Sequence, residues 1–82
     1  MTTTVEPTML HEAHDLAGAR RPPKDANLSA WLAFHQGNAR MYRAVAGLDR
    51  WHHHESMYWA GYEERQAATV SDRMQGDKTE RC

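Results

Sequence analysis

The sequence predicts an all-α fold, a small domain of three helices whose last two form an antiparallel hairpin. β-Branched residues, which favour strands, are nearly absent from the middle of the chain, where Val45 is the only one between Met9 and Ala68. The same stretch is rich in Ala, Leu, Met, Arg, Glu and Gln, which lose little side-chain entropy in a helix. A chain of 82 residues has room for one such domain.

The first helix is expected to run from about Met9 to Arg20. Thr8 can serve as its N-cap, because a threonine hydroxyl accepts a hydrogen bond from a backbone N–H of the first turn. The pair Pro22 and Pro23 ends it, because the residue before a proline is kept out of the α region. At the helical period its apolar stripe contains Met9, Ala13, Leu16 and Arg20, flanked by Leu10 and Ala17.

The second helix is expected to begin near Leu28 and to run to a break at Ala46-Gly47-Leu48. Asn27 or Asp25 can cap its start, because both side chains accept from first-turn N–H groups. Gly47 can end the helix by taking the left-handed conformation after its last turn.

The third helix is expected from about Arg50 to Val70, with Asp49 as its N-cap. A hairpin turn at Gly47 then brings the second and third helices together. One continuous helix through Gly47 is the alternative, since an internal glycine costs about 1 kcal/mol relative to alanine.

Apolar side chains become too sparse to pack at both ends of the chain. We therefore expect a single helical domain over residues 8–71, with a disordered N-terminus at 1–7 and a disordered C-terminal tail at 72–82. A domain of this size buries only about 60% of the surface that its unfolded chain exposes, so no deep substrate cleft is expected.

The composition limits the classes of partner. Ten basic and eleven acidic residues give a formal net charge of −1, so nothing draws the whole chain to nucleic acid or to anionic membranes, and we expect neither as a partner. No stretch approaches the roughly 18 consecutive apolar residues of a membrane span, and the N-terminus lacks a secretory signal. Cys82 is the only cysteine, so there is no disulfide framework, and we expect a cytoplasmic protein.

Motifs for catalysis are missing from the sequence. Ser29, Ser56 and Ser71 lack the glycine-rich elbow of a nucleophilic serine, and no glycine loop of the kind that cradles phosphate is present. We therefore expect no enzyme and infer no small-molecule substrate.

Two apolar stripes have a polar residue at their centre, His35 in the second helix and Glu55 in the third. A hairpin would place Glu55 near Tyr42, and His35 near Tyr62 on the facing helix. Hydrogen bonds between these groups would fix the register of the two helices. The predicted polar core comprises His35, Tyr42, Glu55, Tyr58 and Tyr62.

Three consecutive histidines, His52 to His54, directly precede Glu55. Neighbouring residues on a helix point about 100° apart, so the three cannot converge on one ion without ligands from elsewhere. The zinc-protease pattern H-E-x-x-H is absent. We expect no cofactor. The alternative is a site for zinc or another divalent transition metal, completed within the chain or across a dimer by His11, His14, His35, His52, His54 and Glu55.

All seven aromatic residues fall in the second and third predicted helices. The second helix has two apolar stripes about 90° apart, and only one of them can pack inside the hairpin. The other needs the first helix or a partner to cover it. We therefore expect self-association or a protein partner, with an interaction surface composed of Trp31, Phe34, Met41, Trp51 and Trp59.

The most specific block of the sequence is Asp49-Arg-Trp-His-His-His-Glu55-Ser-Met-Tyr-Trp-Ala-Gly-Tyr-Glu63, and it is preceded by His11-Glu-Ala-His14 and Trp31-Leu-Ala-Phe-His35. Together these segments resemble a family of short uncharacterised actinobacterial proteins. The resemblance covers about residues 8–65. It implies a small cytosolic helical protein, and it brings no activity, cofactor or catalytic residue.

The sequence thus predicts a small non-enzymatic intracellular protein with an interaction or regulatory role, acting through an aromatic helical surface. Its histidines can make the interaction sensitive to pH, because histidine titrates near physiological pH. The alternative function is a small transition-metal-binding protein that uses the block from His52 to Glu55, within one chain or across a dimer.

Overall fold

The structure, a computed structural model, describes the backbone of residues 6–80 and the side chains of residues 6–76. Its elements are α1 (Leu10–Ala19), α2 (Leu28–Leu48), the short 3₁₀ turn η1 (Arg50–His52) and α3 (His53–Glu80). The described residues contain no strand, which confirms the predicted all-α class. None of their helices is both long and apolar enough to cross a membrane.

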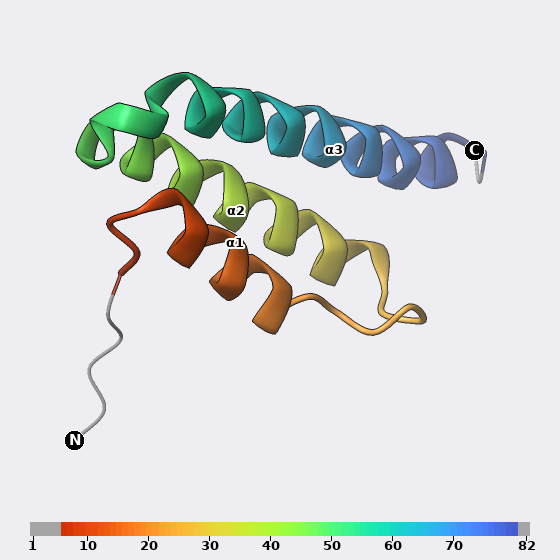
Figure 1. Cartoon of the computed structure of the whole chain (residues 1–82). Coiled ribbons are helices and arrows are strands. Elements are labelled where there is room, and N and C mark those ends of the chain that lie inside the picture. The colour runs from red at the N-terminus through yellow and green to blue at the C-terminus, as the bar shows by residue number, and fades with distance from the viewer. Residues whose placement is uncertain (1–5, 81–82) are drawn as a thin grey trace.

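The helices α2 and α3 form an antiparallel hairpin, and α1 lies beside α2 and runs opposite to it (Figure 1). The start of α1 and the hairpin turn lie at the same end of the molecule, and the loop from α1 to α2 lies at the other end. The predicted hairpin is therefore confirmed, and the alternative in which the second and third predicted helices form one continuous helix is excluded.

The core lies where the three helices meet. Ala13 of α1, Val45 of α2 and Ala60 of α3 are fully buried there. Small side chains at this point allow the helix axes to approach closely. The core cluster consists of Leu10, Ala13, Tyr42, Val45 and Ala60, with Met41 and Trp59 packed against it.

The first helix begins one residue later than predicted, and its cap differs. Met9 is at the N-cap position, and Thr8 does not cap the helix. Instead, the Glu12 carboxylate reaches back to accept from the backbone N–H groups of Thr8, at 3.0 Å, and Met9, at 3.3 Å. A carboxylate in the first turn also suits the positive end of the helix dipole, which explains why Glu12 replaces the hydroxyl cap.

The predicted start of α2 is confirmed, and the helix ends within the predicted break, but the predicted role of Gly47 is wrong. Asn27 caps the helix by accepting from the Ala30 backbone N–H at 2.9 Å. At the other end the helix continues to Leu48, and Gly47 does not take a left-handed conformation. The Asp49 N–H still donates to the Val45 carbonyl at 2.8 Å, so the chain turns only at Asp49, one residue before η1.

The third helix is longer than predicted. It continues past Val70 to Glu80, so residues 72–80 of the predicted disordered tail are helical. No proline interrupts this stretch, and Met74 is half-buried, so the helix has no local reason to stop at Val70. Pro7 belongs to the predicted disordered N-terminus, yet its side chain is half-buried. Residues 1–5 and 81–82 lie outside the described residues.

Ala60→Leu should lower the free energy of unfolding by about 1–3 kcal/mol, because the added methyl groups have no space where the three helices meet. Ala68→Leu is the matched control, since Ala68 lies on the exposed face of α3 and should change stability by less than about 0.5 kcal/mol. Urea unfolding followed by circular dichroism measures both. Equal, small effects of the two substitutions would contradict the packing described above.

Candidate functional site

Asp49 joins the start of α1 to the hairpin turn. Its buried carboxylate accepts from the Leu10 backbone N–H at 3.0 Å and from Nδ1 of His52 at 2.9 Å, both at Oδ2. The first N–H groups of a helix have no partner within the helix, so Asp49 satisfies one of them from a distant part of the chain. The hydrogen bond from Leu10, followed by the contribution of His52, holds the pKa of Asp49 below its ordinary value of 3.8 despite the opposing effect of burial.

The predicted position of Asp49, next to the third helix, is correct, but its predicted role as a side-chain cap is wrong. Its carboxylate does not cap η1, although its carbonyl accepts from the His52 N–H at 3.1 Å. The Asp49 carboxylate instead accepts from the Leu10 backbone N–H at the start of α1. An aspartate in a turn was the available signal, but the partner lies 39 residues away along the chain, so local sequence could not identify it.

Four histidines have different partners in different places. Nδ1 of His35 lies 2.6 Å from Oε1 of Glu63, while Nδ1 of His14 shares a hydrogen bond of 2.8 Å with the Tyr42 hydroxyl. His53 donates from Nδ1 to the carbonyl oxygen of Ala46 at 2.8 Å, and His52 binds Asp49 as described above.

The residues of the alternative metal site are not brought together. His11, His54 and Glu55 are exposed, and the other three members are His14, His35 and His52, each with the separate partner given above. Across the part of the chain that the structure describes, no three His, Cys, Asp or Glu side chains are grouped as metal ligands would be.

The predicted polar core is partly wrong. His35 and Tyr42 do form polar contacts inside the molecule, but with Glu63 and His14 rather than with Tyr62 and Glu55. Tyr62 is half-buried, at a ring-centroid distance of 5.5 Å from Trp59. The other two predicted members, Glu55 and Tyr58, are exposed, the latter by 59%.

The most deeply buried positions of α3 hold mostly small side chains, and Trp59 packs beside them at the edge of the core. The buried residues on this face of α3 are Ser56, Ala60, Glu63, Ala67 and Val70, which follow each other at alternating steps of four and three. A connection of one residue between α2 and η1 holds the two helices close together, and bulky side chains on this face would separate them. This spacing is visible in the sequence, but the aromatic stripe beside it is more apolar and therefore predicts the core at the wrong positions.

Burial determines the ionisation of Tyr42. Burial, and after it the negative charge of Glu63, together raise the pKa of Tyr42 from 10.0 to about 12, and Arg20 opposes the shift. The phenol is therefore neutral at physiological pH and keeps its hydrogen bond to His14. The Trp59 ring lies 5.2 Å from the His14 ring and 6.3 Å from the Tyr42 ring, so the bond belongs to an aromatic contact between all three helices.

Of the five predicted interaction residues, only Trp51 is fully exposed, at 95%. Met41 and Trp59 pack against the core cluster. Trp31 and Phe34 are half-buried: they contact each other, and the Arg21 guanidinium lies 5.2 Å above the Trp31 ring. The other four therefore mainly contribute to packing, because α1 and the hairpin cover the second stripe of α2.

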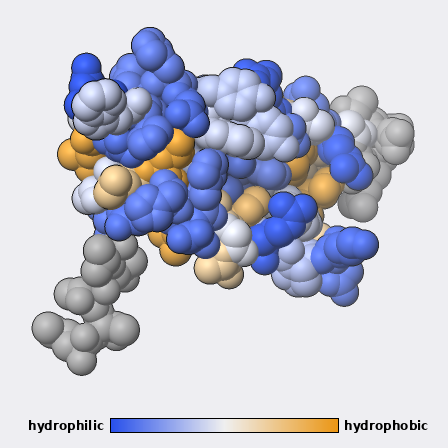
Figure 2. Space-filling view, viewed as in Figure 1, coloured by the Kyte–Doolittle hydropathy of each residue, from blue (hydrophilic) through white to orange (hydrophobic). Residues whose placement is uncertain are grey.

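Two residues that the prediction left out accompany Trp51. Leu48, the last residue of α2, is 61% exposed. Met9, which directly precedes Leu10, is 43% exposed, and Leu10 is the residue whose N–H binds Asp49. We call Met9, Leu48 and Trp51 the hairpin-end surface. Figure 2 shows hydrophobic side chains at this end of the molecule. The sequence pattern had placed Met9 in the core stripe of the first helix.

Comparison with known proteins gives no relative: no family model, curated protein or solved structure matches the chain. The resemblance to an actinobacterial family therefore stays a prediction.

Asp49→Ala should lower the melting temperature and loosen α1, because the Leu10 N–H loses its acceptor. Asp49→Asn keeps an oxygen acceptor without the charge and should have a smaller effect.

Since the folded-state pKa of Asp49 is lowered, the charge contributes stability above pH 3.8, and this contribution disappears as the pH falls through the lower folded-state value. The wild type and Asp49→Asn should therefore converge in acid.

Thermal unfolding followed by circular dichroism between pH 7 and acid measures these differences. Asp15→Ala, which removes an exposed carboxylate from α1, serves as the control and should leave the melting temperature unchanged. A melting temperature of Asp49→Ala equal to that of the wild type would show that the bond to α1 contributes nothing.

Tyr42 should ionise only near pH 12. In a pH titration followed by the ultraviolet absorbance of tyrosinate, the wild type should show an absorbance step near this pH that the Tyr42→Phe variant lacks. In the unfolded chain the phenol ionises near pH 10, and in the folded chain only near pH 12. The contribution of the neutral phenol to folding stability is therefore complete below pH 10 and is lost as the pH rises towards about 12. Ionisation of every tyrosine near pH 10 in the folded chain would contradict the burial of Tyr42.

Proposed function

We propose that the chain is a small non-enzymatic interaction protein of the cytoplasm that binds a protein molecule through the hairpin-end surface. The observation that supports this most strongly is the 95% exposure of Trp51, three residues after Leu48, which is 61% exposed. Tryptophan is among the residues that most often dominate the energy of protein interfaces. A partner that covered these two side chains would remove a large apolar area from water.

Several hydrogen bonds fix the turn between α2 and α3 that carries the hairpin-end surface. His52 donates to Asp49, Asp49 accepts from the Leu10 backbone, and His53 donates to the Ala46 carbonyl. These bonds come from α1, α2, η1 and α3, so the backbone that displays Trp51 is held on several sides. A preorganised surface loses less conformational entropy on binding, which favours affinity.

The partner is either a second copy of the chain or another protein with an apolar surface. Both would cover Trp51 and Leu48, and one experiment distinguishes them by mass. The alternative of transition-metal binding has less support, because the structure leaves its proposed ligands in separate places.

A photoreactive phenylalanine derivative placed at position 51, in the cells that naturally make the chain, should crosslink to one product of defined mass. A product of twice the chain mass indicates self-association, and another mass identifies a second protein by mass spectrometry. The same group at Met57, an exposed residue of α3 outside the hairpin-end surface, is the control and should give no such product. Absence of a product at position 51, or equal yields at both positions, would contradict the proposal.

A further inference from the structure

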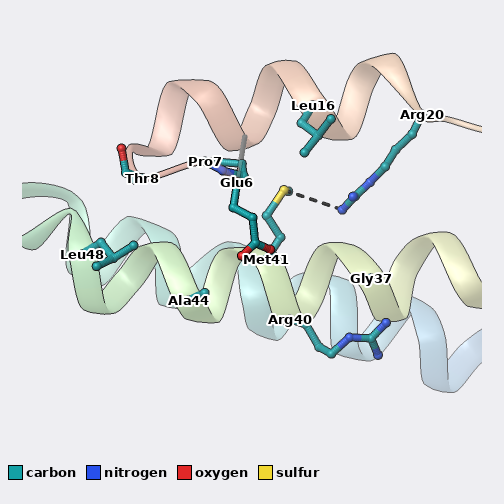
Figure 3. Close-up of a pocket in the computed structure, with 10 residues that line it drawn as sticks. All are labelled: Glu6, Pro7, Thr8, Leu16, Arg20, Gly37, Arg40, Met41, Ala44 and Leu48. Carbon is teal, nitrogen blue, oxygen red and sulfur yellow. Dashed lines mark hydrogen bonds between the residues drawn. The ribbon is translucent and has the colours of Figure 1, made fainter. Parts of the chain in front are cut away.

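A groove of about 630 Å³ lies between α1 and α2 (Figure 3). Its apolar lining comes from Pro7, which precedes α1, from Leu16 of α1, and from Met41, Ala44 and Leu48 of α2. This volume is within the range of about 300–1,000 Å³ typical of sites for small ligands. The groove is therefore large enough for a small molecule with an apolar part.

One end of the groove is positively charged. Arg20, at the end of α1, and Arg40, on α2, both approach Gly37, where a Cβ atom would lie 3.9 Å from Nη2 of the first and 4.0 Å from Nη2 of the second. Figure 3 shows the two side chains on either side of Gly37. Because glycine has no side chain, nothing from this position separates the two guanidinium groups.

The Arg20 guanidinium is held in place by neutral groups. Oδ1 of buried Asn38 accepts from its Nε at 3.2 Å and from its Nη2 at 2.8 Å, and Nη2 also lies 3.6 Å from the Met41 sulfur. Within residues 6–76, neither Arg20 nor Arg40 forms an ion pair with a carboxylate. Two cations thus lie at one end of a largely apolar groove, and no carboxylate of residues 6–76 is paired with either.

We propose that the groove binds a small amphipathic carboxylate, whose alkyl chain lies along Leu16, Met41 and Ala44 and whose charged group lies between Arg20 and Arg40. Guanidinium groups suit a carboxylate because they can donate two parallel hydrogen bonds. Gly37 and Leu48 are eleven residues apart, which corresponds to about 16 Å along α2 and suits an alkyl chain of medium length.

The other charge in the groove is consistent with this orientation. Among the described residues of the lining, Glu6 is the only acidic one, and Figure 3 shows its carboxylate beside Met41, between α1 and α2. Its negative charge would repel a carboxylate from that part of the groove and leave the arginine end as the favourable position. The site differs from the hairpin-end surface, with which it shares only Leu48, so either proposal can fail without the other.

The test is an NMR titration of the labelled full chain with decanoate below its micelle concentration, compared with decanol and with acetate. Decanoate should give saturable shifts at the backbone amides of Gly37, Met41 and Ala44. Decanol lacks the charge and acetate lacks the chain, so both should bind at least about tenfold more weakly. Shifts that are equal for decanoate and decanol, or that lie outside the groove, would overturn the proposal.

Two substitutions locate the site. Arg40→Gln should weaken decanoate binding about tenfold, whereas Arg43→Gln, on the same helix, removes an arginine that pairs with Glu64 and should leave it unchanged. Ala44→Phe should block the apolar part while both arginines remain. Unchanged binding in Arg40→Gln or in Ala44→Phe, with helicity equal to that of the wild type, would overturn the proposal.

Discussion

The hydrogen bond from the Leu10 backbone to the Asp49 carboxylate links the first helix to the hairpin, and the other features of the molecule depend on it. A hairpin of two helices leaves one side of its apolar surface uncovered, and α1 is the element that covers it. The helix α1 has only ten residues, and helices of that length are marginal in isolation. Its stability must therefore come from its contacts with the rest of the chain.

Both proposed binding regions follow from the position of α1. The hairpin-end surface combines Met9, which precedes the bonded residue of α1, with Leu48 and Trp51 on either side of Asp49. The groove exists because α1 lies beside α2, and Arg20 reaches Asn38 from the end of α1. Displacement of α1 would change both regions together, so the fold and the proposed binding are physically coupled.

The fold could be predicted from the sequence because its signals are local. The lack of β-branched residues gave the class, and the Asn27 cap marked the start of α2. The site could be predicted only in part, because burial depends on contacts between distant segments. The stripe of Trp51, Glu55 and Tyr58 looked like a core, yet the tight turn favours small side chains between the helices and leaves these residues exposed. The bond from Asp49 to Leu10 has no local signature.

Hydrogen exchange at the Leu10 backbone amide tests this dependence most directly. Leu10 and His11 both lie in the first turn of α1, where backbone N–H groups lack a partner within the helix. If the Asp49 carboxylate holds the Leu10 N–H, this amide should exchange far more slowly than that of His11, at a rate near that of the Val45 amide in the core. Equal, fast exchange at Leu10 and His11 would show that α1 is not held at the hairpin turn.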